Sequence, residues 1–109
     1  MERREVPAAT TRRFEAIAEA LAGRGVSASK MFGMPCLKTG GKVFAGVFGD
    51  AMVFKLRGDA HARALELRGA ALFDPAAMGR PMKECVVVPP THAKQWSALA
   101  ERARGYVAG

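Results

Sequence analysis

The sequence has few of the residues on which catalytic and metal sites depend. It contains two cysteines, Cys36 and Cys85, and two histidines, His61 and His92, and no Cys-x-x-Cys pair or metal-ligand cluster. Zinc sites and thioredoxin-like centres need such spacing. A Walker A loop and a dinucleotide-binding glycine fingerprint are also missing, and the strand-forming segments hold too few carboxylates for paired-acid hydrolysis. The sequence therefore predicts no catalytic residue, no metal and no cofactor.

Long hydrophobic runs are also missing. No apolar segment approaches the roughly 18 residues that span a bilayer, and residues 1–7 lack the apolar stretch of a signal peptide. These absences predict a cytoplasmic protein without a membrane partner. In a reducing cytoplasm, Cys36 and Cys85 are expected to serve as small buried hydrophobic residues.

Positive charge, in contrast, is in excess. The 109 residues include 17 Lys and Arg against 10 Asp and Glu, which gives a formal net charge of +7. Such an excess favours anionic partners, including nucleic acid. The alternative is that the cations only solvate the surface, because they are spread along the chain and interrupted by acids. The length suits one domain with a modest core.

A predicted β-hairpin over residues 42–57 organises the chain. Two runs rich in apolar residues flank Gly49 and Asp50, which suit a tight two-residue turn. Because cross-strand partners share a sheet face, one face is wholly apolar and must be covered: Val43, Ala45, Val47, Met52, Phe54 and Leu56. The opposite face has an apolar centre ringed by cations: Lys42, Phe44, Gly46, Phe48, Ala51, Val53, Lys55 and Arg57.

Sequence periodicity places three helices and further strands around this hairpin. Residues 1–9 are predicted to form a frayed tail, and residues 10–109 a single domain. Thr10 or Thr11 would cap a first helix, residues 58–69 would form a second, and Thr91 would cap a third that holds Trp96. Strands are predicted at 26–32, 34–38, 71–73 and 82–88. This order predicts an α+β domain of two layers, with helices packed on one face of an antiparallel sheet.

The register beside Gly40 and Gly41 decides which face two further residues occupy. A two-residue turn would place Leu37 on the open face beside Phe44, and Cys36 on the covered face. A β-bulge at this point would invert both assignments.

Three segments carry a resemblance to a known family. They are Lys30-Met31-Phe32-Gly33, residues 41–48 and residues 79–89, followed by a helix that contains Trp96. In this order they resemble the N-terminal domain of the TfoX/Sxy family over roughly residues 12–107. Residues 41–45, Gly-Lys-Val-Phe-Ala, are similar, less closely, to the MmcQ/YjbR group.

The resemblance implies a two-layer α+β fold with a curved antiparallel sheet and a bacterial regulatory role. The members that gave the family its name promote competence gene expression together with a cyclic-AMP-responsive transcription factor. They carry a further C-terminal helical domain, which the 109 residues do not include. The family supplies no established catalytic residues.

Three functions follow as alternatives. The leading prediction is a non-enzymatic interaction module that binds a protein partner or a second copy through an open-face patch of Lys42, Phe44, Phe48, Val53, Lys55 and Arg57; the same face could instead be covered as a second small core. The second is nucleic-acid binding, with phenylalanines stacking on bases among cations. The third is a small-ligand binder or enzyme with a pocket between sheet and helices near Met31, Cys36 and Arg80, where Arg80 is a candidate anion contact.

Overall fold

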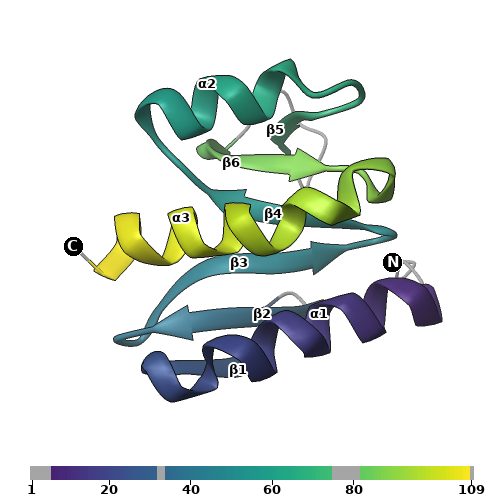
Figure 1. Ribbon diagram of the computed structural model, residues 1–109. Helices are drawn as coiled ribbons and strands as arrows, with labels where there is room; N and C mark the ends of the chain where they lie inside the picture. Colours follow the sequence, from purple (N-terminus) through teal and green to yellow (C-terminus); the bar gives the residue numbers. More distant parts are fainter. Residues whose placement is uncertain (1–5, 32–33, 75–81, 109) are drawn as a thin grey trace.

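The elements of the chain alternate between helices and runs of strands (Figure 1). The computed structural model describes residues 6–31, 34–74 and 82–108. In chain order the elements are α1 (Ala8–Leu21), the 3₁₀ turn η1 (Ala22–Arg24), β1 (Val26–Met31), β2 (Met34–Thr39), β3 (Lys42–Phe48), β4 (Ala51–Lys55), α2 (Gly58–Glu66), β5 (Ala71–Phe73), β6 (Met82–Val88), the 3₁₀ segment η2 (Pro90–Gln95) and α3 (Trp96–Ala108).

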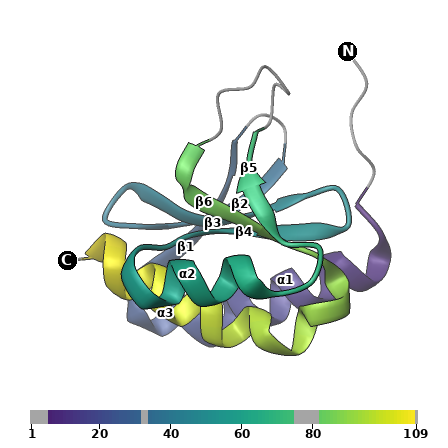
Figure 2. The same cartoon turned by 90° about the horizontal axis from the view of Figure 1, so that it is seen from above.

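The six strands form one sheet in the order β1-β2-β3-β4-β6-β5, and every neighbouring pair is antiparallel. Helices α1, α2 and α3 all lie on the same side of this sheet (Figure 2). The predicted α+β architecture of two layers is therefore confirmed. The pairing of Phe48 with Ala51 and of Val47 with Met52 also confirms the two-residue turn at Gly49 and Asp50.

A β-bulge between β2 and β3 reverses four of the predicted face assignments. Leu37 pairs with Ala45 and Lys38 with Val43, so one extra residue, Phe44, is inserted on β3. Phe44 and Leu37 are fully buried in the core with the helices, although both were predicted on the open face. Cys36 and Val43, predicted on the covered face, line a hollow on the open face instead. The reason is that an extra residue shifts the side-chain alternation by one.

The core fills the space between the sheet and the helices. Its largest fully buried side chains are Trp96, Phe44, Phe54, Leu37, Met52 and Leu56. The Trp96 indole Nε1 donates a hydrogen bond of 3.2 Å to the Val88 carbonyl, so the ring is anchored to β6 while it packs in the core. Trp96 thus has the predicted role of a core anchor.

The first helix begins differently from the prediction. Helix α1 starts at Ala8, after Pro7 and without a side-chain cap, so it includes two residues of the expected tail. Thr10 is buried, and its Oγ1 donates a 2.9 Å hydrogen bond to the Asp50 carbonyl at the β3–β4 turn. The N-terminal cap predicted at Thr10 or Thr11 is therefore wrong. The Thr10 hydroxyl instead joins the helix to the β3–β4 hairpin.

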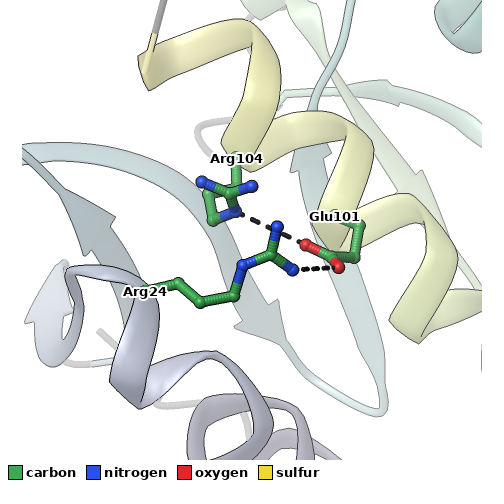
Figure 3. Close-up of polar contacts among 3 residues, drawn as sticks. All are labelled: Arg24, Glu101 and Arg104. Atoms are coloured by element: carbon green, nitrogen blue, oxygen red, sulfur yellow. Dashed lines mark hydrogen bonds and ion pairs between the residues drawn. The ribbon is translucent and has the colours of Figure 1, made fainter.

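The third helix also starts later than predicted. Thr91 lies in the 3₁₀ segment η2, and α3 begins at Trp96. A partly exposed ion triad joins α3 to η1: the Glu101 carboxylate contacts the guanidinium groups of both Arg24 and Arg104 (Figure 3). In the part of the chain that the structure describes, no helix has both the length and the apolar character to cross a membrane.

Candidate functional site

The open face of the sheet, which carries no helix, contains a hollow of about 550 Å³. Residues of five strands, β2 to β6, line it. Most of the described lining is apolar, and Met82 is the one large hydrophobic residue of the described chain that is exposed, at 41%. A concave apolar site of this size is typical of small-molecule binding.

The hollow forms because the sheet curls away from the helices. The rings of Phe48 on β3 and Phe73 on β5 meet edge to face, with centroids 5.0 Å apart and an interplanar angle of 73°. Strands β4 and β6 lie between them in the sheet, so a flat sheet would separate β3 from β5 by about 14 Å. The contact therefore requires a concave open face, and Figure 2 shows strand ends rising on the side opposite the helices.

Small side chains form the floor of the hollow. Gly46 lies between its partners Cys36 and Val53 in neighbouring strands, and all three line the hollow. A Cβ added at Gly46 would lie 3.3 Å from the Pro35 carbonyl oxygen, closer than ordinary contact. Strand pairing thus leaves little room for a side chain at this point, and the glycine adds no bulk to the floor.

Three lysines, Lys42, Lys55 and Lys83, and one acid, Glu84, are the charged residues of the described lining. The Lys55 Nζ lies 3.8 Å from a Glu84 carboxylate oxygen, and the two side chains are 38% and 51% exposed. Glu84 also accepts a hydrogen bond from the Tyr106 hydroxyl of α3. That hydrogen bond is the main reason why the pKa of Tyr106 is raised.

The two cysteines are free thiols on the open face, Cys36 buried and Cys85 half-buried. Burial raises the pKa of Cys36, against a smaller lowering effect of Lys38. Burial likewise raises the pKa of Cys85, which Lys55 lowers less. Both groups are therefore neutral thiols at neutral pH, and a neutral thiol is a poor nucleophile.

Neither histidine is among the described lining of the hollow, and each ring is held by a backbone carbonyl. The Nε2 of His61 lies 2.7 Å from the Lys83 carbonyl oxygen, and the Nε2 of His92 lies 2.9 Å from that of Arg68. A carbonyl oxygen can only accept, so each Nε2 carries the proton and donates it. Within residues 6–31, 34–74 and 82–108, no three His, Cys, Asp or Glu side chains are grouped so that they could hold a metal ion.

The residues predicted to form one patch are divided among four environments. Lys42, Val53 and Lys55 line the hollow. Phe44 is also among the residues beside the hollow, but its side chain is fully buried in the core, so its predicted exposure on the open face is wrong. The guanidinium carbon of Arg57 lies 5.1 Å from the centre of the Tyr106 ring on α3. Phe48 packs on Phe73, and the candidate anion contact Arg80 lies outside the described residues.

Sequence reasoning missed several lining residues, among them Phe73, Met82, Lys83 and Cys85. They reach the hollow because β6 pairs with β4, which places Cys85 opposite Lys55. The strand over 82–88 was predicted, but its neighbour in the sheet was not. The near-continuous apolar run from Cys85 to Val88 was the one available signal, since such a run is typical of a strand inside a sheet.

Comparisons of the chain with protein-family models, with curated proteins and with solved structures give no match. The resemblance to the TfoX/Sxy family therefore stays a hypothesis that rests on the three segments quoted above. Any function has to be argued from the geometry of the hollow.

Proposed function

We propose that the protein is a non-enzymatic binding module that holds a small ligand in the hollow of its open sheet face. The observation that carries the proposal is the concave apolar site of about 550 Å³, lined by residues of five strands. Sites of roughly 300–1,000 Å³ with a few polar groups are typical of small-molecule binding. A non-enzymatic role is supported by the neutral thiols and by the position of both histidines outside the described lining of the hollow.

The geometry of the open face supports the binding of a small ligand better than it supports protein docking or nucleic-acid binding, the other two alternatives. A base-stacking platform needs exposed aromatic rings, and the predicted protein-docking patch relied on two exposed phenylalanines. Phe44 is fully buried, and Phe48 is half-buried against Phe73. The open face therefore presents an apolar recess in place of two exposed rings. The pocket itself was predicted between the sheet and the helices, however, whereas the hollow lies on the open face.

The family resemblance adds a regulatory role to this proposal. A module that binds a ligand without changing it serves as a sensor when a partner distinguishes its free and bound forms. A cytoplasmic location is part of the same proposal, because free thiols at Cys36 and Cys85 suit a reducing compartment.

A substitution that fills the hollow tests the proposal. Val43, which is half-buried, lines the hollow, so Val43→Phe should occupy part of the space. The probe is N-phenyl-1-naphthylamine, a neutral apolar dye whose fluorescence rises in apolar sites. We expect the unchanged protein to bind the dye, and the variant to bind it at least about tenfold more weakly, equivalent to about 1.4 kcal/mol.

Val107→Phe is the matched control, because Val107 is also half-buried but packs against the core from α3. It should bind the dye as the unchanged protein does. Thermal unfolding shows that each variant is folded, and Val53→Phe serves as a second filling variant. Equal binding by the folded filling variants and the control, or no binding by the unchanged protein, would overturn the proposal.

A further inference from the structure

We propose that the ligand of the hollow is a free amphipathic carboxylate, with its apolar body on the strands and its carboxylate at the lysines. This inference rests on the proposed function, since it names the chemical class of ligand for the same site. Two features of the lining support it: where its apolar surface lies, and which charges surround that surface.

The apolar part of the lining is continuous across the sheet. Val53 on β4 and Val43 on β3 lie on the floor side, and Phe73 and Met82 come from β5 and β6. The exposed Met82 side chain contributes apolar surface that faces water. Covering such surface with a hydrocarbon body is favourable by about 25 cal/mol per Å² of apolar area removed from water. A wholly polar ligand would gain nothing from this surface.

The charged part of the lining selects the polar end of the ligand. Among the described lining residues, three lysines and one acid leave a surplus of two positive charges. Lysine side chains pack their aliphatic part on apolar surface and keep their ammonium groups in solvent. Lys42, Lys55 and Lys83 can therefore cover the body of a ligand and meet an anionic group at the mouth of the hollow.

Lys55 is the cation best placed for this contact. Its half-buried side chain lies on the open face opposite Cys85. The 3.8 Å between its Nζ and Glu84 exceeds the length of a hydrogen bond. An ammonium group has three donors, so it can donate to a ligand carboxylate while it stays close to Glu84. Glu84 in turn is shared with Tyr106.

The small surplus of charge favours a monoanion over a polyanion. Glu84 lies at the same site and would repel a phosphate-rich ligand more strongly than a single carboxylate. The floor is also poorly exposed to water, because Cys36 is 2% and Val53 is 8% exposed. In such surroundings a charge-assisted hydrogen bond is stronger than in water.

Competition between decanoate and 1-decanol for the dye tests this inference. The two molecules have the same chain and differ in the carboxylate. At low salt and neutral pH, decanoate should displace N-phenyl-1-naphthylamine at a concentration at least about tenfold lower than 1-decanol, since one charge-assisted hydrogen bond contributes enough for that ratio. The Lys55→Met/Lys83→Met double variant should lose this preference and keep its affinity for 1-decanol.

Lys94→Met is the matched control, because Lys94 is exposed on η2, outside the described lining of the hollow. It should keep the preference for decanoate. Equal displacement by both molecules from the unchanged protein would overturn the carboxylate assignment and leave the proposed function standing. The same would follow if Lys94→Met reduced the preference as much as the double variant does. Failure of the unchanged protein to bind the dye at all would overturn both.

Discussion

The two faces of the sheet are built from the same strands, but one is closely packed against helices while the other contains a hollow. The helix-covered face carries Phe44, Phe54 and Met52, all fully buried under α3 and its neighbours. The open face has Gly46, Cys36 and Val53 at its centre and encloses about 550 Å³. Large side chains fill the space under the helices, whereas small side chains lie at the centre of the concave face. The first face therefore stabilises the fold, and the second is the face on which we propose a ligand binds.

The two faces also differ in how their charges are balanced. Arg24, Glu101 and Arg104 form a partly exposed ion triad that joins η1 to α3 on the helix side. The three lysines of the open face have one acid, Glu84, among the described lining. Charges that are paired within the protein hold elements together, whereas a local surplus can hold an anion.

The largest change in the free energy of unfolding is expected when Phe44 or Phe48 is replaced. The sequence placed these two residues on the same face of the sheet. Phe44→Ala should lower the free energy of unfolding by about 3–5 kcal/mol, because it leaves a cavity in the packed core. Phe48→Ala should cost about 1–2 kcal/mol, since it removes a half-buried ring and its edge contact with Phe73. Urea denaturation measures both. Equal losses would contradict the assignment of the two rings to different faces.

A smaller effect is expected at Thr10, which joins the helix layer to the central hairpin. Thr10→Val keeps the branched shape and removes the hydroxyl that donates to the Asp50 carbonyl. The loss should be about 1 kcal/mol in the free energy of unfolding. Thr11→Val is the control, one residue further along α1, and should stay within about 0.5 kcal/mol of the unchanged protein. A larger loss at Thr11, as the predicted helix cap requires, would contradict the structure.

The smallest effect is a pH dependence from the ion triad. Desolvation raises the pKa of Glu101, but the hydrogen bonds and charges of Arg24 and Arg104 outweigh it, so the pKa is lowered. A carboxylate with a lowered pKa stabilises the fold above its ordinary pKa, and this stabilisation is lost as the pH falls through the lowered value. The stability difference between the unchanged protein and Glu101→Gln should therefore shrink on acidification below about pH 4.3.

Urea denaturation at neutral and acidic pH measures this difference. A difference that does not change with pH would show that Glu101 has no lowered pKa.

Local sequence signals predicted the elements well and the helix starts poorly. Gly49 and Asp50 define the central hairpin, because few residue pairs suit so tight a turn, and its register is as predicted. Thr10 and Thr91 are of a residue type that often caps helices, but α1 starts at Ala8 and α3 at Trp96. Tertiary contacts decided otherwise: the Thr10 hydroxyl reaches Asp50, forty positions along the chain.

The candidate site could be predicted only in part. Lys42, Val53 and Lys55 were placed on the open face by alternation along a strand, and they line the hollow. Phe44 was placed there by the same rule and lies in the core, because a single inserted residue at the bulge shifts the alternation. The sequence left a β-bulge between β2 and β3 open as an alternative, and the structure confirms a bulge there. The local pattern did not decide between the bulge and the unbroken alternation.

The sequence by itself determined the class of fold and the hairpin at its centre, because both follow from short-range periodicity and turn chemistry. The tertiary structure alone decided that β6 pairs with β4 and that Phe48 meets Phe73 across two strands. Those contacts curl the sheet and make the hollow. They join residues far apart in the chain, and their geometry depends on the packing of all six strands together, which no local pattern specifies.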